Sequence, residues 1–350
     1  MKVAVIGIRG MGKTHLQALK KCKLVRDVAG CDLDATVRAA VGRELAVRTF
    51  ADVAALLREY RPDAVVIATP PNTHGQVARA CLEQGVALLT EKPICSTLQE
   101  SAELVELAER KNVPFQCGFE LRYCGSIRAV QSLLDAGELG RLTCIGLVQI
   151  SGSHTEPGYM SRARTGGIFY EKLCHQVDLF RFFFGEPRRV MAIAAPQIIQ
   201  HYEIEDNVLA VFEFAAGALG TIKFDTRRAA QINGLAQPEQ TFEGRAAGHF
   251  YELTFSGDRG TAVYDAWTET VDLIKQNQRP DRKAELARRI NIQEEFGRPS
   301  YDVDTQNADF LQNVKAGKPV RYPARDALKT MTWVERAEES LRRHGEWLGA

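Results

Sequence analysis

The sequence lacks paired cysteines, long apolar runs and an excess of either charge. Its eight cysteines are scattered, with no C-x-x-C pair and no zinc-ligand spacing, so we predict no metal site. Scattered cysteines are typical of buried or free thiols in a reducing cytoplasm. The N-terminal apolar run is too short for a signal peptide, and no stretch approaches the length of a membrane span. We therefore expect a cytoplasmic protein that makes no membrane contact.

Charge is balanced, which argues against nucleic acid as a partner. Lysine and arginine number 45 against 44 acidic residues, and no basic patch stands out. Internal repeats and low-complexity tracts are also absent. The 350 residues are 45% hydrophobic and 25% charged, as in ordinary soluble globular proteins, and this length suggests two domains with separate cores.

A glycine-rich turn near the N-terminus is the first pattern that carries chemistry. Residues 3–6 form a short apolar run typical of a buried strand, three glycines follow, and the next apolar residues fall at helical spacing. A strand that turns sharply into a helix directs free helix N–H groups at an anion, most often a pyrophosphate. Asp32 ends the next apolar run, about where a carboxylate would bind an adenosine ribose. We predict that a dinucleotide contacts Gly7, Ile8, Arg9, Gly10, Met11, Gly12 and Asp32.

The turn departs from the dinucleotide fingerprint G-x-G-x-x-G at one position. Arg9 occupies the third position, where glycine lets the backbone approach the phosphates. Its guanidinium could bond a phosphate, its bulk could close the site, or the turn could be structural and bind nothing. Asp32 followed by Asp34 favours NAD over NADP, because two carboxylates would repel a 2′-phosphate. Only Arg9 and Arg38 lie near enough in the sequence to reverse that preference.

Strands and helices alternate through residues 1–119, which predicts a domain with a doubly wound parallel sheet. The predicted strands cover residues 3–6, 24–31, 47–50, 64–69, 86–89 and 113–117, and the helices between them begin near residues 11, 35, 52, 74 and 96. A capping box of Ser96 and Gln99 would open the last of these helices. Ligands of such sheets bind beyond the carboxyl ends of the strands, where the glycine turn, residues 69–74 and residues 91–93 would meet.

Polar residues in the last two segments extend the predicted cofactor site. They are Thr69, Pro70, Asn72, His74, Glu91 and Lys92. Lys92 follows a buried strand, so its amine can reach a cleft at the carboxyl edge of the sheet. Structural alternatives exist, since prolines can simply stop a strand, His74 can be a core histidine and Lys92 a solvated lysine.

From Gly118 the pattern changes to strands without intervening helices, which predicts a second α/β domain over residues 120–350. The predicted strands are 142–150, 190–199, 207–214, 219–227, 251–255 and 261–264, with helices at 127–136, 168–184, 304–314 and 324–343, the last of which could pack back on the first domain. Alternating polarity along these strands predicts a sheet with one buried face, and turns at 216–217 and 257–260 predict antiparallel neighbours. Residues 228–248 and 279–300 are polar and irregular, as expected of loops or lids.

The predicted helix at 168–184 carries the second chemical pattern. Glu171 and His175 are four residues apart and share a helix face, with Asp178 three residues further along. A histidine held by a carboxylate can take a proton near neutral pH, which suits a general base. The alternative is a helix whose polar side meets solvent or caps a loop. The loop before this helix offers candidate substrate contacts, namely His154, Tyr159, Arg162 and Arg164. These residues could equally form a solvated loop. Arg122 is a further candidate with the same two interpretations.

Together these motifs resemble the glucose–fructose oxidoreductase, inositol dehydrogenase and rhizopine catabolism family (Gfo/Idh/MocA) over nearly the whole chain. The resemblance rests on the glycine turn with His15, Ala-Thr-Pro-Pro-Asn-Thr-His at 68–74, Glu-Lys-Pro at 91–93, and Gly166-Gly167 with His175 and Asp178. It implies a Rossmann domain followed by an α/β domain with a large, mostly antiparallel open sheet. It also implies a homodimer or homotetramer formed through that sheet. The sequence departs from the family at Arg9 and at Glu171, where many members carry aspartate.

The resemblance further implies NAD(P)-linked hydride transfer between a sugar or polyol carbon and the nicotinamide. Lys92 would hold the reacting hydroxyl, His175 would remove its proton, and Glu171 would orient His175 or contact a substrate hydroxyl. The predicted substrate-binding set is Lys92, Arg122, His154, Tyr159, Glu171 and His175. Two other functions stay open, namely an NAD-dependent glycoside hydrolase that oxidises a hydroxyl transiently and a non-catalytic dinucleotide sensor.

Overall fold

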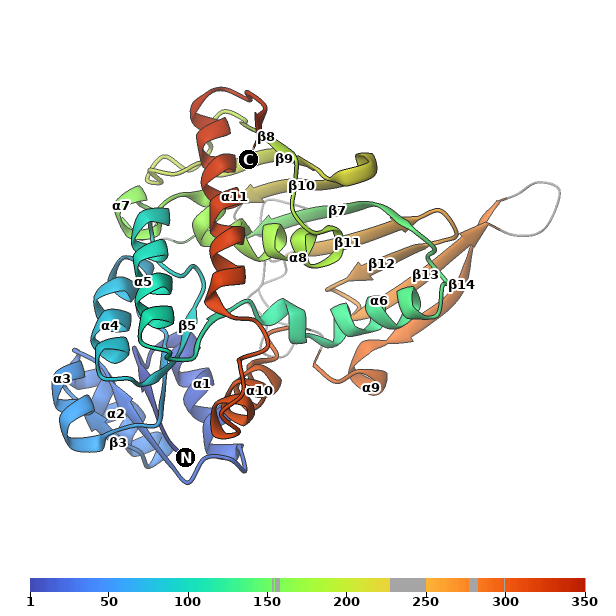
Figure 1. Cartoon of the computed structure of the whole chain (residues 1–350). Coiled ribbons are helices and arrows are strands. Elements are labelled where there is room, and N and C mark those ends of the chain that lie inside the picture. The colour runs from blue at the N-terminus through green and yellow to red at the C-terminus, as the bar shows by residue number, and fades with distance from the viewer. Residues whose placement is uncertain (153, 155–157, 227–249, 277–282, 299, 350) are drawn as a thin grey trace. The chain divides into compact units, whose positions relative to one another are not determined.

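A computed structural model describes residues 1–152, 154, 158–226, 250–276, 283–298 and 300–349 (Figure 1). The chain divides into two compact units, each with its own sheet. The first unit comprises Met1–Glu120, Arg162–His175 and Asp302–Thr332, and the second comprises Leu121–Ser161, Gln176–Tyr301 and Trp333–Ala350. None of the described helices combines the length and apolar character needed to cross a membrane.

The first sheet has six parallel strands in the order β3-β2-β1-β4-β5-β6. They are β1 (Lys2–Ile6), β2 (Asp27–Cys31), β3 (Arg48–Phe50), β4 (Ala64–Ile67), β5 (Ala87–Glu91) and β6 (Phe115–Gly118). Every residue of β4 and β5 is buried, as expected of central strands covered on both faces. The predicted doubly wound parallel sheet is therefore confirmed.

Helices alternate with these strands, and polar side chains cap several of them. They are α1 (Gly10–Lys21), α2 (Ala35–Leu45), α3 (Val53–Ala55) with η1 (Leu56–Tyr60), α4 (Pro71–Glu83) and α5 (Leu98–Arg110), and the unit also contains α7 (Arg162–Thr165), η3 (Phe169–Leu173) and α10 (Val303–Lys315). Asp34 and Asp52 accept backbone N–H groups at the starts of α2 and α3. The predicted capping box at Ser96 is wrong by one residue, because the side chain of Thr97 accepts the N–H of Glu100 and caps α5.

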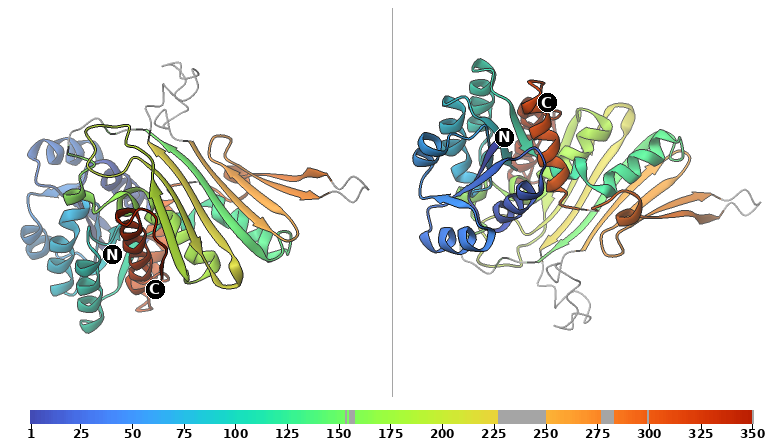
Figure 2. Two further views of the ribbon diagram at one scale, coloured as in Figure 1. Left: turned by 90° about the horizontal axis from the view of Figure 1, so that it is seen from above. Right: turned by 90° about the horizontal axis from the view of Figure 1, so that it is seen from below.

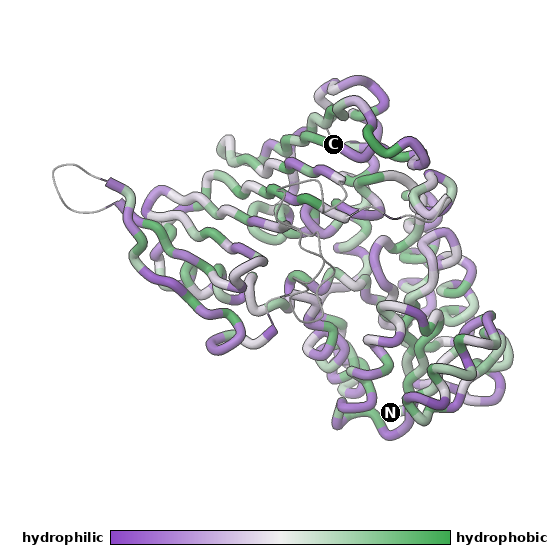
Figure 3. Tube along the Cα trace, turned by 180° about the vertical axis from the view of Figure 1, so that it is seen from behind, coloured by the Kyte–Doolittle hydropathy of each residue, from purple (hydrophilic) through white to green (hydrophobic). Residues whose placement is uncertain are grey.

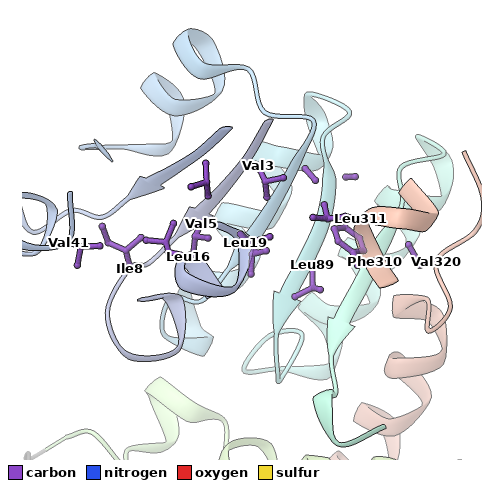
Figure 4. Close-up of a cluster of buried hydrophobic side chains, with 14 residues drawn as sticks. Val3, Val5, Ile8, Leu16, Leu19, Val41, Leu89, Phe310, Leu311 and Val320 are labelled. Carbon is purple, nitrogen blue, oxygen red and sulfur yellow. The ribbon is translucent and has the colours of Figure 1, made fainter. Parts of the chain in front are cut away.

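Side chains from β1, α1 and α10 share one buried apolar cluster (Figure 4). Its members include Val3, Val5, Ile8, Leu16, Leu19, Leu89, Phe310 and Leu311. Burying a large apolar side chain stabilises the fold by about 1.5–3 kcal/mol, so Phe310 and Leu311 bind α10 firmly to the first unit. The same packing brings the Asn307 side chain of α10 to 3.1 Å from the His15 ring of α1.

The second sheet has nine strands in the order β14-β13-β12-β11-β7-β10-β9-β8-β15. They are β7 (Leu142–Ser151), β8 (Arg189–Ala194), β9 (Asn207–Glu213), β10 (Leu219–Thr226), β11 (Phe250–Gly257), β12 (Thr261–Asp265), β13 (Thr270–Gln276), β14 (Ala284–Asn291) and β15 (Leu348–Gly349). Every neighbouring pair is antiparallel except β7 and β10. The predicted second sheet, large and mostly antiparallel, is confirmed.

Two helices, α6 (Gly125–Asp135) and α8 (Cys174–Phe184), lie on one face of the second sheet (Figure 2). The rings of Phe180 and Phe212 meet edge-on with centroids 5.9 Å apart, and those of Phe183 and Phe255 at 5.2 Å. Buried and more exposed residues alternate along β9 and β10, and Figure 3 shows both polar and apolar residues along the strands. The last long helix, α11 (Ala324–Arg342), is divided between the two units after Thr332.

Three sequence predictions for the second half need correction. The loop predicted at 279–300 contains β14 and α9 (Ile292–Glu295), because β14 is mostly exposed and lacks the apolar alternation of a half-buried strand. The strand predicted at 190–199 ends at Ala194, shortly before Pro196, which has no N–H to donate. The helix predicted at 168–184 begins as the π-helix η3 and continues as α8. The loop predicted at 228–248 lies outside the described residues.

Candidate active site

Strand register brings the predicted cofactor segments together at the carboxyl edge of the first sheet. Ile6 of β1 pairs with Cys31 of β2 on one side and with Ile67 of β4 on the other. The glycine turn, Asp32 and the loop after β4 therefore leave the sheet next to one another. This edge is where doubly wound sheets bind their ligands.

The glycine turn has the close packing that a dinucleotide-binding turn requires. A Cβ on Gly12 would lie 1.7 Å from the carbonyl oxygen of Gly7, so only glycine lets α1 start this close to the turn. The N-terminus of α1 has no side-chain cap and no acidic residue in its first turn. Its positive end is thus available to a phosphate, and the residues present fit a bound pyrophosphate.

Arg9 forms an exposed ion pair with Asp34. Asp34 also caps α2 by accepting two backbone N–H groups, and these bonds, together with the charge of Arg9, lower the pKa of its carboxyl. Asp32 accepts the N–H of Ile8 at 3.1 Å and that of Asp34 at 2.9 Å. Its carboxylate is therefore held beside the turn, and each oxygen keeps a lone pair for a ribose hydroxyl.

The loop after β4 is held in place by His74. This fully buried side chain lies with its ring nitrogens 2.9 Å from the carbonyl oxygen of Pro93 and 2.8 Å from that of Thr69. Burial lowers the pKa of the imidazole in spite of these contacts. His74 thus joins two of the predicted cofactor segments, whereas Pro70 and Asn72 of the same loop are exposed.

Glu91 belongs to a buried polar network that reaches α1 and α10. Its Oε1 lies 2.8 Å from Nε2 of His15, whose Nδ1 lies 3.1 Å from Asn307. Its Oε2 accepts the backbone N–H of Lys92 at 3.3 Å. Burial alone would raise the pKa of Glu91, but His15 and the charge of Lys92 lower it. Glu91 therefore fixes the start of the segment that carries Lys92.

Lys92 places a permanent positive charge at the end of β5. Its ammonium donates to the backbone carbonyl oxygen of Glu171 at 3.0 Å. Burial would lower the pKa of this ammonium, but Glu171, Cys174 and Glu91 outweigh burial and raise it above the ordinary 10.5. Lys92 therefore stays protonated at neutral pH, where it can donate hydrogen bonds but cannot take a proton.

The segment that carries Glu171 and His175 is anchored against the chain just after Lys92. Gly166 adopts a φ of 89°, and a Cβ there would lie 2.4 Å from the carbonyl oxygen of Ser96. This close approach requires glycine. It explains why a glycine pair precedes the histidine in the sequence.

His175 is held neutral. Its Nε2 lies 3.4 Å from Oε2 of Glu120, and its buried Nδ1 has no hydrogen-bond partner among the described residues. Burial, assisted by the charge of Lys92, lowers the pKa of the imidazole well below 6.5. The Phe119 ring stands edge-on to it, with centroids 5.8 Å apart. A neutral imidazole with an unpaired nitrogen is suited to accept a proton.

Glu120 is the residue of this constellation that sequence reasoning missed. It opens η2 (Glu120–Tyr123) two residues after the end of β6, and β6 pairs with the strand that ends in Glu91. Only its place a few residues after a predicted strand could have marked it, because no motif residue stands beside it. The structure therefore gathers Lys92, Glu171 and His175 with a further buried carboxylate.

Comparisons with known proteins decide the family. Residues 1–119 match the model of the oxidoreductase family with an NAD-binding Rossmann fold, and residues 127–263 match that of the GFO/IDH/MocA C-terminal domain. The chain belongs to the Gfo/Idh/MocA oxidoreductase family.

Relatives of this Gfo/Idh/MocA protein cover almost its whole length. It is 30% identical to inositol 2-dehydrogenase 2 of Mycolicibacterium vanbaalenii, over 92% of this chain and 87% of that protein. It is 24% identical to myo-inositol 2-dehydrogenase of Thermotoga maritima, over 97% and 96%. The structure of levoglucosan dehydrogenase in complex with NADH and levoglucosan matches with a TM-score of 0.79 over 100% of this chain and 99% of that one. At 19% identity this match shows a shared fold.

Arg122 is buried and committed to an ion pair in this Gfo/Idh/MocA protein. Its guanidinium makes two bonds to Asp178 of α8, at 2.7 and 2.6 Å, and lies over the ring of Phe182. The sequence predicts Arg122 as a candidate substrate contact and places Asp178 three residues after His175. The structure pairs the two with each other within the second unit, and a substrate contact of Arg122 stays a prediction.

The remaining predicted substrate residues lie in two places. His154 and Tyr159 contact each other in the second unit, and Arg162 and Arg164 belong to a short helix of the first unit. His154 stacks on Tyr159 with 4.1 Å between ring centroids, and its backbone N–H donates to the hydroxyl of Tyr202 at 2.6 Å. Arg162 and Arg164 are half-buried in α7. Across the described residues, no three His, Cys, Asp or Glu side chains gather as a metal site, and all eight cysteines are reduced thiols.

Proposed function

We propose that this protein is an NAD-dependent dehydrogenase that moves a hydride between a hydroxyl-bearing carbon of a sugar or cyclic polyol and the nicotinamide. The observation that carries the proposal is the pairing of a charged Lys92 with a neutral His175 at the carboxyl edge of a Rossmann sheet. Neighbouring groups whose pKa values are pushed apart divide the roles of hydrogen-bond donor and proton acceptor.

Oxidation of an alcohol removes a hydride from the carbon and a proton from the oxygen. Lys92 would donate a hydrogen bond to the hydroxyl oxygen and stabilise the negative charge that develops there. His175 would take the hydroxyl proton as the carbon–oxygen bond becomes double, and would then pass that proton to solvent. Reduction would use the same residues in reverse, with His175 supplying the proton.

Bound NAD would supply the acceptor for the hydride. The turn from Gly7 to Gly12 would hold the pyrophosphate, with Ile8, Arg9, Gly10 and Met11 between them, and Asp32 would bind the ribose. Because Arg9 and Asp34 neutralise each other, the preference for NAD over NADP rests on Asp32. The loop that contains Thr69 would complete the cleft edge.

The substrate class is supported by the names of the relatives. Two of them are inositol dehydrogenases that match along nearly the whole chain, and one similar structure contains levoglucosan. Inositols and levoglucosan all carry several hydroxyl groups on a ring. We therefore propose an inositol or a sugar, held by Lys92, Glu171 and His175, as the substrate of this protein.

A panel of inositol isomers, levoglucosan and common sugars tests the proposal, with NADH absorbance and mass spectrometry of the ketone product as readouts. Lys92→Met should lower kcat by about 10²- to 10³-fold, because one donor to the developing charge is lost. Lys111→Met is the matched control, since Lys111 is exposed and bonds only the carbonyl of Glu83 among its described contacts. Full turnover by Lys92→Met would refute the role of Lys92.

The alternative functions give different results in the same assays. A chromogenic glycoside cleaved without net NADH would favour the transient-oxidation hydrolase. Binding of a dinucleotide in calorimetry without turnover of any compound in the panel would favour the sensor. Both outcomes would overturn the proposed dehydrogenase.

A further inference from the structure

We propose that Glu120 is the positioning carboxylate of His175, which fixes the imidazole as the Nε2–H tautomer and leaves Nδ1 as the atom that exchanges the substrate proton. This inference deepens the proposed function and rests on it. Glu120 is buried, and its Oε2 lies 3.4 Å from Nε2 of His175, at the outer limit of a hydrogen bond. Such contacts are often long in the absence of substrate and tighten when the reactants are bound.

The tautomer follows from the chemistry of the two groups. A neutral imidazole has one nitrogen that donates and one that accepts, and an ionised carboxylate only accepts. The nitrogen that faces Glu120 must therefore carry the hydrogen, which makes Nδ1 of His175 the acceptor. That atom is buried and has no hydrogen-bond partner within the described part of the chain. A buried acceptor without a partner is positioned to receive a hydroxyl.

Sequence spacing pointed to Glu171 as the partner of His175, but the local helix geometry does not support that pairing. Residues Phe169–Leu173 form a π-helix, whose wider turn changes which residues share a face. The described contacts of Glu171 include no hydrogen bond or ion pair to His175; instead its carbonyl oxygen receives the ammonium of Lys92. The backbone of Glu171 thus accepts from Lys92, whereas the carboxylate next to the His175 ring is that of Glu120.

A buried ion pair lies just after Glu120 and His175 along the chain. Arg122 lies two residues after Glu120 in η2, and Asp178 lies three residues after His175 in α8. Their side chains are 5% and 1% exposed and their bonds are 2.6 and 2.7 Å long. Within the first unit Glu120 faces His175, and within the second unit the residues two and three positions further along are paired with each other.

The imidazole nitrogens of His175 can be observed directly in protein labelled with ¹⁵N-histidine, with the signal assigned by its loss in His175→Gln. We expect wild-type protein to show protonated Nε2 and unprotonated Nδ1. Glu120→Met removes the acceptor at similar volume and should give a mixture of tautomers, whereas Glu120→Gln retains an acceptor oxygen and should restore the wild-type form. Glu171→Gln is the matched control and should leave the tautomer unchanged.

Kinetics provide the second readout. Glu120→Met should lower kcat by about 10²- to 10⁴-fold with little change in KM, because a wrong tautomer affects proton transfer rather than substrate binding. Glu120→Gln should recover part of that loss. A residue with a purely structural role would change KM and kcat together and would leave the tautomer as it is.

The proposal is overturned if wild-type His175 carries its hydrogen on Nδ1, an outcome that needs no variant to fold. It is also overturned if Glu171→Gln changes the tautomer and Glu120→Met does not. The tautomer measurement requires no substrate, so it remains valid if the panel shows no dehydrogenase activity. In that case the proposed function fails while the pairing of Glu120 with His175 is still decided.

Discussion

Arg122 and Asp178 form a buried ion pair whose two partners depend on each other. Removal of one partner from such a pair leaves an uncompensated charge and costs about 3–5 kcal/mol. We expect Asp178→Asn and Arg122→Met each to lower the free energy of unfolding by this amount, as measured by urea denaturation. The double variant Arg122→Met/Asp178→Leu should cost less than the two singles combined, because no charge is left buried. Single variants within about 1 kcal/mol of wild type would contradict this reading.

The protonation of His175 should respond to Lys92. Its pKa is lowered first by burial and second by the lysine charge, so Lys92→Met should raise the pKa toward 6.5 without reaching it. NMR titration of the His175 ring measures this change, and the exposed Lys111→Met serves as control. In wild-type enzyme the acid limb of kcat/KM should therefore lie well below pH 6.5. A wild-type His175 that titrates at or above 6.5 would contradict the prediction.

A residue could be predicted as part of the candidate site where its chemistry and a sequence motif pointed to it. It could not be predicted where only tertiary packing determines which side chain it contacts. Lys92 and His175 stand in recognisable segments, and the fold places both where the sheet ends. Glu120 reaches His175 only through the pairing of β6 with β5, which no local pattern reveals. His74 and Arg122 also fall in promising segments, yet their partners are carbonyl oxygens and Asp178.

At the scale of elements, the turn between β1 and α1 depends on the absence of a side chain at Gly12. A Cβ there would meet the Gly7 carbonyl oxygen at 1.7 Å, so Gly12→Ala must displace the start of α1. We expect a loss of about 3 kcal/mol or more in thermal or urea unfolding, together with loss of NAD binding in calorimetry. Gly85→Ala is the control, because Gly85 has a φ of 72° and open space around it.

Gly85→Ala should cost only about 1–2 kcal/mol, the penalty of a left-handed conformation for an alanine. It should also bind NAD as wild type does. Equal losses in the two variants would mean that backbone conformation, rather than the close approach of α1 to the turn, is what Gly12 provides.

Helices and strands were easier to predict from the sequence the more fully they are buried in the structure. The strands of the first sheet stand out because central parallel strands are continuous apolar runs, as Ala64–Ile67 shows. The strand Ala284–Asn291 was not predicted, because an edge strand whose residues are mostly exposed, several of them charged, has no periodic apolar pattern. The π-helix Phe169–Leu173 was predicted as part of an ordinary helix, because apolar spacing over five residues does not distinguish a π-helix from an α-helix.

For the molecule as a whole, two buried histidines predict loss of stability in mild acid. His74 and His175 have pKa values below 6.5 in the folded state, so the unfolded chain binds more protons once the pH falls below about 6.5. Each group then contributes up to about 1.4 kcal/mol of lost stability per pH unit. Urea unfolding at several values between neutral pH and pH 5 measures the slope. His175→Gln should reduce it, and an unchanged slope would contradict the assignment.

The exposed face of the second sheet predicts self-association. Ile193 of β8 and Leu209 of β9 are cross-strand partners, exposed to 41% and 51%, and the register across the sheet places Leu219 and Leu286 on the same face. Exposed apolar side chains on one open sheet face are typical of protein interfaces, and copies of one chain associate most often through a two-fold axis. We therefore expect a homodimer or homotetramer in light scattering after gel filtration.

The substitution Leu209→Lys tests which face is used. It places a second positive charge beside Lys223, the partner of Leu209 in β10, and should shift the protein toward monomer in a concentration-dependent manner, because an unpaired charge would have to be buried in the interface. Trp267→Glu is the matched control, since Trp267 is equally exposed, at 51%, but lies in the turn after β12. If the control dissociates the assembly and Leu209→Lys does not, subunits meet elsewhere. A wild-type monomer at all concentrations would show that these leucines face solvent in the working protein.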